Sequence, residues 1–353
     1  MCVIIMYNII KRIGMTKHIL AFAVTVTMAV GAVAQDVTTS YNFLDITSSS
    51  RVYALGGHNI SIVDDDVMIG DQNPAMLGPE LNKQVGVSYM RYLGSSNFFG
   101  ARYGQGVDEH SAFSVGIQNF GYGTFEGYDV TGTYTGDFSA NDIVVNAAYS
   151  RDINDYWRGG INAKYVYSKY EDYTAGALGV DLGINYYNAD HEFSFSMVAK
   201  NLGGQVKKFT DEKVNLPWDV QLGVSKQFTG LPVRISATMY HMRKWHEAYY
   251  EPADKNNSSS ELVKKDSFGR DLFRHLVFGV EFLPSNNIYA AIGYNYRTRT
   301  DMSSYQRGLL SGFSAGAGIK VKAFGIGIAL AQPHTGATTF MFNLTTNIGE
   351  LLR

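Results

Sequence analysis

The sequence has 353 residues, a formal net charge of −2 and 13% aromatic residues. This near-neutral charge excludes a strongly basic nucleic-acid-binding protein. Glycine is abundant, with 37 residues, whereas proline is scarce, with 7 residues. Proline is rare where hydrogen-bonded strands are long, so the composition favours a strand-rich chain.

The N-terminus has the pattern of a secretory signal peptide. Basic residues at positions 11, 12 and 17 precede an apolar stretch, 19–30, and a small-residue motif that ends at Ala34. The stretch is shorter than the roughly 20 residues that a spanning helix needs. We therefore expect residues 1–34 to be removed, with 1–14 as an upstream start-site extension. The only cysteine, Cys2, would leave with them, so disulfides and cysteine-ligated metals are excluded.

From Gln84 onward, apolar residues alternate with small or polar residues in segments of about ten, the length that a tilted strand needs to cross a bilayer. In 178–186 and 324–330 every second residue is apolar, and the residues between them are mainly glycine, aspartate or asparagine. One face of each strand is expected to contact lipid and the other to line a polar interior. Because the second face is not apolar, a soluble antiparallel sandwich is the disfavoured alternative.

This alternation predicts an all-β fold, a transmembrane antiparallel β-barrel of about 14 strands in residues 84–353. An even number of strands returns both ends of the barrel to one side of the membrane. The predicted strands are 84–92, 97–104, 111–120, 138–150, 157–169, 177–187, 192–201, 218–228, 232–244, 273–282, 287–297, 309–321, 323–331 and 338–348.

The connections between these strands alternate in length. Bacterial barrels have short periplasmic turns and longer extracellular loops, so the alternation supports the strand count independently. Short turns are expected at 188–191, 229–231 and 284–286, and long outer loops at 121–137, 202–217 and 245–272.

The segment before the barrel, residues 35–83, does not alternate and is expected to plug the pore. Gly56-Gly57 tolerates a tight backbone turn, and Asn73-Pro74-Ala75 marks a chain reversal. With the acidic run Asp64-Asp65-Asp66 between them, this segment resembles the entry segment of FadL-like outer-membrane barrels. The resemblance implies that the segment lies inside the pore, ahead of the first strand.

Short motifs along most of the remaining chain carry a more specific resemblance. They are Phe43-Leu44, Ser88-Tyr89, Tyr92-Leu93, Gln118 to Gly123, Tyr165 to Ser168 and Ala199 to Gly203. Together with the Asn-Pro-Ala segment, this ordered set looks like the PorQ family of the type IX secretion system. The resemblance implies a Gram-negative, Bacteroidetes-type outer membrane and an attachment complex. In that complex the barrel would anchor a PorZ-like surface protein beside PorU and PorV.

The three consecutive carboxylates, Asp64, Asp65 and Asp66, could bind a hard cation such as Ca²⁺. Their spacing lacks the alternation and the closing glutamate of an EF-hand loop. The favoured interpretation is a turn in the lumen whose charges are solvated or are neutralised by arginines of the barrel strands. No metal site and no cofactor are predicted.

The strongest candidate for catalysis is the cluster of His241, His246 and Glu247 at the expected outer rim of the barrel. Zinc needs a third ligand at fixed geometry, and the sequence contains no HExxH motif. Histidines and Trp245 in an interfacial aromatic belt explain the cluster more simply. No enzymatic activity is expected.

The expected outer loops carry candidate partner-binding residues. Cations on these loops could contact phosphates of lipopolysaccharide or an acidic partner. Acidic residues lie among them, so a solvated, mixed-charge surface is the favoured interpretation. The candidates are Lys207, Lys208, Lys213, Lys264 and Lys265, with the aromatic residues Trp245, Tyr249 and Tyr250.

Two functions are left open, both in the lipid bilayer of the outer membrane. The first hypothesis is docking, in which a plugged barrel anchors the surface protein through its long loops. The second is transport of hydrophobic small molecules, which needs an apolar pocket beneath the loops. The predicted lumen positions are chiefly small or polar, which favours docking. The plug residues Ile60, Ile62, Val63 and Leu77 are the candidates for lining a pocket.

Overall fold

The computed structural model describes residues 41–209, 214–245, 250–252, 262–264, 267–301, 310–334 and 337–351. The predicted signal peptide and residues 35–40 of the predicted plug lie outside these ranges. The structure below is that of the unit Thr39–Arg353.

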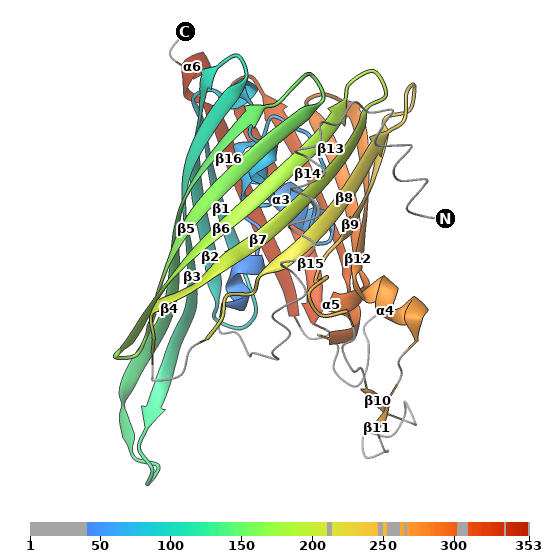
Figure 1. Cartoon of the computed structure of the whole chain (residues 1–353). Helices are drawn as coiled ribbons and strands as arrows, with labels where there is room; N and C mark the ends of the chain where they lie inside the picture. The colour runs from blue at the N-terminus through green and yellow to red at the C-terminus, as the bar shows by residue number, and fades with distance from the viewer. Residues whose placement is uncertain are drawn as a thin grey trace, which may run out of the picture. The chain divides into compact units, whose positions relative to one another are not determined.

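Fourteen antiparallel strands of this unit form a closed barrel (Figure 1). Strand β1 pairs with the last strand, β16, and Gln84 lies opposite Asn347. Closure leaves the barrel without an edge strand, as lipid requires. The predicted barrel and its number of strands are therefore confirmed. The strands are β1 (Gln84–Arg91), β2 (Asn97–Asp108), β3 (Ser111–Tyr128), β4 (Tyr134–Asp152), β5 (Trp157–Tyr170), β6 (Tyr173–Asn188), β7 (Phe193–Lys207), β8 (Asp219–Gln227), β9 (Val233–Met239), β12 (Leu276–Ser285), β13 (Ile288–Asn295), β14 (Phe313–Val321), β15 (Phe324–His334) and β16 (Ala337–Asn347).

The strands bury polar residues and expose apolar residues, which is the reverse of a water-soluble sheet. In β6, Leu182 is 38% exposed and Asp181 is 1% exposed. In β15, Ile326 and Ile328 are exposed and Ala329 is buried. Apolar surface costs about 25 cal/mol per Å² in water, so this outer band requires an apolar solvent. The barrel is therefore of the transmembrane type.

The barrel has two different ends. The end with the short turns and α6 (Ile348–Leu351) is called the turn end, and the opposite end is called the loop end (Figure 1). The loop end carries α4 (Phe268–Arg274), α5 (Tyr296–Asp301) and a small sheet of β10 (Tyr250–Pro252) and β11 (Leu262–Lys264). Among the described helices, none combines the length and the hydropathy needed to cross a membrane.

Residues 41–83 lie inside the barrel (Figure 1) and form its hydrophobic core together with inward apolar residues of the strands. Leu55 and Ile62 belong to a buried cluster with Met90 of β1 and Met341 of β16. This segment thus supplies much of the apolar filling of the lumen, because the strands turn mainly small and polar residues inward and add only some apolar ones. Its helical elements are η2 (Asn42–Asp45), α3 (Ser50–Ala54), η3 (Val67–Asp71), η4 (Pro74–Met76) and η5 (Pro79–Leu81).

The predicted loop at 121–137 is wrong. Strands β3 and β4 continue past their other neighbours as a two-stranded hairpin that extends beyond the barrel (Figure 1). Aromatic pairs across the hairpin stabilise it, since Phe125 stacks on Phe138 at 5.4 Å and Tyr128 contacts Tyr134 at 5.9 Å between ring centroids. The predicted loop at 202–217 also begins too early, because β7 runs to Lys207.

Several predicted strand ends at the loop end are wrong as well. Strand β9 ends at Met239 rather than at 244, because His241 adopts a φ of +57° and its N–H donates to Asp219 Oδ2 at 2.6 Å. Strand β13 ends at Asn295, whose side-chain oxygen accepts the N–H of Thr298 at 3.1 Å, so α5 begins there. The predicted starts at 273 and 309 precede the observed starts of β12 and β14, and residues 273–274 belong to α4.

Candidate functional site

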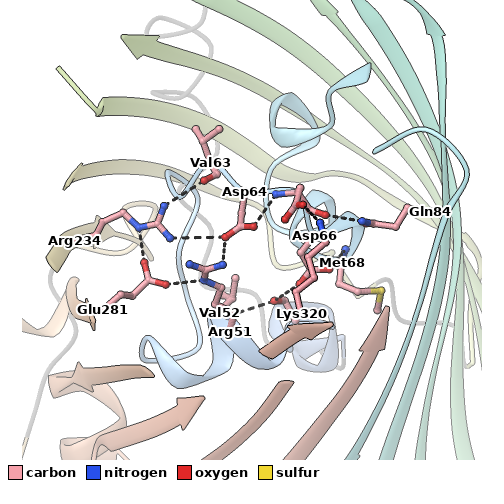
Figure 2. A network of polar contacts seen from close by, with 12 residues as sticks. Arg51, Val52, Val63, Asp64, Asp66, Met68, Gln84, Arg234, Glu281 and Lys320 are labelled. Atoms are coloured by element: carbon pink, nitrogen blue, oxygen red, sulfur yellow. Dashed lines mark hydrogen bonds and ion pairs between the residues drawn. The ribbon is translucent and has the colours of Figure 1, made fainter. Parts of the chain in front are cut away.

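Two arginines and two carboxylates form an ion-pair network in the lumen (Figure 2). Arg51 of α3 donates through Nε to Glu281 Oε1 at 2.6 Å, and Arg234 of β9 donates to Glu281 Oε2 at 2.6 Å. Asp64 is ion-paired with Arg51 and lies 3.9 Å from Arg234 Nη2. Glu281 is only 1% exposed, so its charge depends on these partners rather than on water. The four residues are called the ion-pair network below.

The network joins the plug to three barrel strands. Glu281 lies on β12 and Arg234 on β9, and the Arg51 guanidinium lies 4.4 Å from the ring centroid of Tyr289 on β13. Arg234 also donates to the backbone oxygen of Val63 at 3.2 Å. The balanced charges hold α3 in one place against the wall.

The rest of the acidic run has different partners. Asp65 is ion-paired with Lys320 of β14, and Asp66 caps η3 by accepting the N–H of Met68 at 2.9 Å (Figure 2). Burial raises the pKa of Asp66, because a buried carboxyl favours its neutral form more than an exposed carboxyl does. Within the described ranges, no group of three or more histidine, cysteine or acidic side chains is placed to hold a metal ion.

A second set of polar contacts holds the middle of the plug. Asp71 accepts from Gln118 Nε2 of β3 at 2.6 Å and lies 3.4 Å from Arg102 Nη2 of β2. Asn343 of β16 accepts the N–H of Ser50 at 2.5 Å and donates to the backbone oxygen of Ser48 at 2.9 Å. Lumen side chains thus act as hydrogen-bond partners for plug backbone that has no sheet of its own.

The predicted reversal at Asn73-Pro74-Ala75 lies against β5 and β6. Asn73 Oδ1 accepts the N–H of Ala75 at 2.9 Å, and Asn73 Nδ2 donates to the backbone oxygen of Ile60 at 2.9 Å. A Cβ atom at Gly160 would lie 2.4 Å from the Pro74 carbonyl carbon. The reversal can therefore approach the wall only because the strand carries glycine there.

Gly56-Gly57 forms the predicted tight turn after α3. Both residues have positive φ, 96° and 85°, which other residues adopt only with strain. The N–H of Gly56 donates to Ser314 Oγ at 2.9 Å, and Ser314 Oγ donates to the backbone oxygen of Ala54 at 2.8 Å. Ser314 is the centre of a Gly-x-Ser-x-Gly run, 312–316, but it lies in strand β14 rather than in a strand-to-helix elbow.

A pocket of about 210 Å³, called the loop-end pocket, lies between the plug and the strands at the loop end. Its apolar lining comes from Ile46 and Tyr53 of the plug, Tyr92 after β1, and Phe313 and Pro333 of the barrel. Its remaining lining residues are Asn42, Asp45, Thr47, Gly56, Gly57, His58, Asn295, Thr298, Gly312, Ser314, Ala331 and Gln332.

Two titratable plug residues adjoin this pocket. Burial raises the pKa of Asp45 to about 6, and Asp45 Oδ2 lies 3.9 Å from His241 Nε2. His58 stacks on Tyr240 with 4.2 Å between ring centroids, and burial lowers its pKa, so its imidazole is neutral at pH 7. The pocket wall is therefore close to uncharged below about pH 6.

A larger pocket of about 450 Å³, called the turn-end pocket, opens at the other end of the plug. Its lining is charged and includes Arg51, Asp64, Arg234 and Lys320, together with Val63. The two pockets meet opposite sides of α3, since Tyr53 lines the loop-end pocket and Arg51 lines the turn-end pocket. The ion-pair network therefore lies where a continuous path through the lumen would have to open.

The structure places the other candidate residues as follows. Ile60, Ile62 and Leu77 are fully buried in the core and line neither of these two pockets. Lys207 donates to Thr174 of β6, Lys208 is exposed, and Trp245 stacks on His275 with 4.8 Å between ring centroids. Of Tyr250 and Lys264 only the backbone is described, in β10 and β11, and Lys213, His246, Glu247, Tyr249 and Lys265 lie outside the described residues.

Sequence reasoning anticipated that an arginine of the barrel strands neutralises part of the acidic run, as Arg234 does beside Asp64, but it missed Arg51 and Glu281. A signal existed in the strands, because Arg234 and Glu281 occupy inward positions of otherwise small or polar faces. Arg51 gave no such signal, because nothing in the sequence around it indicates a contact with Glu281, which lies 230 residues later in the chain.

No protein-family model and no curated protein matches the sequence. Solved structures share its fold. The Ralstonia pickettii toluene transporter TbuX superposes with a TM-score of 0.51 at 11% identity, over 86% of this chain and 98% of that chain. The Pseudomonas putida toluene transporter TodX superposes with a TM-score of 0.52 at 14% identity, over 86% of this chain and 99% of that chain. The monoaromatic hydrocarbon channel CymD superposes with a TM-score of 0.53 at 11% identity, over 88% of this chain and 99% of that chain.

At these identities the likeness establishes the fold and nothing finer. The predicted fold class, a transmembrane antiparallel β-barrel of about 14 strands, is confirmed. The resemblance to the PorQ family stays a prediction.

Replacing Glu281 by glutamine should destabilise the protein by about 3–5 kcal/mol, because two buried arginines would lose their shared carboxylate. Urea unfolding in detergent micelles, followed by the electrophoretic mobility of the closed barrel, measures the effect. Glu126→Gln on the exposed hairpin is the matched control and should leave stability unchanged. Equal midpoints for the two variants would show that the network does not hold the plug.

Asp45 should make stability depend on pH. Its folded pKa, about 6, lies above the ordinary value of 3.8, so the protonated form is favoured in the folded state. The stabilisation is fully present below pH 3.8 and is lost as the pH rises through about 6. Thermal unfolding of wild type and Asp45→Asn between pH 4 and 7 tests this, and the difference between the two should change across that window. A constant difference would contradict it.

Proposed function

We propose that this protein is a non-enzymatic outer-membrane barrel of a Gram-negative bacterium that takes up small hydrophobic molecules. The observation that carries this proposal is the loop-end pocket, in which apolar and aromatic side chains of the plug and the barrel lie among polar side chains. Such a lining is typical of small-molecule sites. With short turns facing the periplasm, the loop end faces the outside, where such a molecule would arrive.

The size of the loop-end pocket indicates one small ligand. An apolar cavity of about 150 Å³ is large enough for benzene, whereas drug-sized ligands occupy roughly 300–1,000 Å³. At about 210 Å³, the pocket matches a single-ring compound. The fold of the toluene transporters TbuX and TodX and of the monoaromatic hydrocarbon channel CymD supports the same ligand class.

Passage from this pocket to the turn end requires α3 to move. Tyr53 and Arg51 of this helix line the two pockets on its opposite sides. Displacing α3 would separate Arg51 from Glu281 and from Asp64. The plug therefore stays closed at rest, and binding must offset the loss of these contacts before the path opens.

Filling the loop-end pocket should weaken binding. Ile46→Trp places an indole in the pocket, and the affinity for para-fluorotoluene should fall by about tenfold or more, because the space for the ring is lost. Fluorine NMR of the protein in lipid nanodiscs measures the affinity. Val63→Trp, at the turn-end pocket, is the matched control. An affinity of Ile46→Trp equal to that of the wild type would contradict the proposal.

A second candidate function is docking, and the β3–β4 hairpin favours it. Its tip is preorganised, since Asp129 Oδ1 accepts the N–H groups of Thr131 and Thr133 at 2.8 and 2.9 Å. Tyr128, Val130 and Tyr134 are exposed. A rigid, aromatic projection binds a partner at low cost in conformational entropy.

The resemblance to the PorQ family supports a specific form of this second candidate. In that form, the hairpin and the predicted loop residues bind a PorZ-like surface protein in an attachment complex with PorU and PorV, and the loop lysines contact lipopolysaccharide. The exposed aromatic side chains of the hairpin supply the type of contact that dominates protein interfaces.

Shortening the hairpin separates the two functions. Replacing residues 125–138 by Asn-Gly leaves a two-residue turn after Thr124 and keeps the barrel closed. A co-expressed PorZ-like protein should then no longer purify with the barrel in mild detergent, while para-fluorotoluene still binds. Ile153→Ala, in the short turn between β4 and β5 at the turn end, leaves the hairpin and the loops intact and is the control. Retention of the partner by the shortened barrel would refute docking through the hairpin.

A further inference from the structure

The outer wall of the barrel carries a groove near the loop end, across β1 to β4. Its volume is about 460 Å³, and it is separate from the two pockets in the lumen. Its lining includes Tyr89 and Phe99 and the three asparagines Asn97, Asn119 and Asn141. This hollow is called the wall groove below.

Strand register explains why a groove forms at this place. Arg91 lies opposite Asn97, Asn97 opposite Gly121, and Gly121 opposite Asn141, so the four form one row across four strands. The row faces outward, since its neighbour in the chain, Asp142, is buried. Gly121 has no side chain, so the row has a gap in its middle.

The wall groove lies at the edge of the lipid-facing band. The next row toward the turn end contains Tyr89, Phe99 and Asn119, and the row beyond it contains Ala101 and Ile117. The outer surface thus changes within three rows from apolar, through aromatic, to amide and charged groups. That order matches the boundary between acyl chains and lipid headgroups.

Two of these asparagines have unused hydrogen-bonding groups. Asn119 Nδ2 donates to Asn141 Oδ1 at 2.9 Å. Among the residues that the structure describes, Asn119 Oδ1 and Asn141 Nδ2 have no protein partner, and both side chains are partly exposed. The hydroxyls of Thr124 and Ser139 complete the lining. One free acceptor and one free donor therefore lie side by side.

This chemistry fits sugar hydroxyls better than phosphate. A hydroxyl both donates and accepts, as the two free amide groups require, whereas phosphate only accepts and prefers arginine or lysine. The one cation of the row, Arg91, already donates to Asn97 Oδ1 at 3.1 Å. The exposed rings of Tyr89 and Phe99 add flat apolar surface beside the amides.

We propose that the wall groove binds the headgroup of a membrane glycolipid. Its sugar hydroxyls bond to Asn119 and Asn141 over the gap at Gly121, and its acyl chains lie along the apolar rows toward the turn end. This site takes a lipid from the surrounding leaflet, and it does not depend on either function proposed above.

Filling the gap tests the proposal. A Cβ atom at Gly121 would meet only Asn141 Oδ1, at 3.7 Å, so Gly121→Leu fits the strand and occupies the groove. Gly159→Leu is the matched control, because Gly159 is an outward strand glycine at the turn end whose Cβ would lie 3.5 Å from Ile153 Cδ1. Both variants add the same side chain to the outer wall.

Nanodiscs of phosphatidylcholine with a minor fraction of galactosyl diacylglycerol provide the probe, and native mass spectrometry measures the lipid retained. Wild type and Gly159→Leu should retain the galactolipid. Gly121→Leu should lose about tenfold, as expected for two lost hydrogen bonds. Unchanged retention by Gly121→Leu would overturn the proposal, as would equal retention of phosphatidylglycerol by wild type. If Gly121→Leu fails to form a closed barrel by electrophoretic mobility, Asn119→Leu/Asn141→Leu decides the question by the same criterion.

Discussion

A backbone that crosses lipid must form its hydrogen bonds within the protein, and the rest of this structure depends on that constraint. The sheet closes between β1 and β16 because an open edge would leave N–H and C=O groups unpaired. Closure creates an interior that lipid cannot reach. The strands turn apolar residues outward, so the interior receives polar residues that need partners of their own.

The plug supplies those partners and the missing apolar core together. Its leucines and isoleucines fill the centre of the barrel, while its charged residues pair with charges of the wall. Buried ion pairs add little net stability, yet a pair that loses one member is costly. The network of Arg51, Asp64, Arg234 and Glu281 therefore specifies where the plug lies more than how stable the protein is. Any motion of α3 has to be coupled to these four charges.

The number of strands and their two faces could be predicted from the sequence, because alternation has a period of two and each strand carries its own signal. The sequence could not define where β3 and β4 end, since the hairpin beyond Gly121 depends on ring contacts such as Phe125 with Phe138 across the strands. Polar composition there suggested a loop. The candidate site was predictable only in part, because Asp64 is visible as an acidic residue, while its partner Arg234 and the Glu281 that pairs with this arginine are distant in sequence.

The seam between the first and last strands has a consequence for how the chain assembles. Gln84 and Asn347 are neighbours in the barrel although almost the whole described chain separates them, and such distant contacts form late. The plug precedes β1 and hydrogen-bonds to Asn343 of β16. The last strand therefore has binding partners inside the barrel as well as along its two edges, where it pairs with β1 and β15.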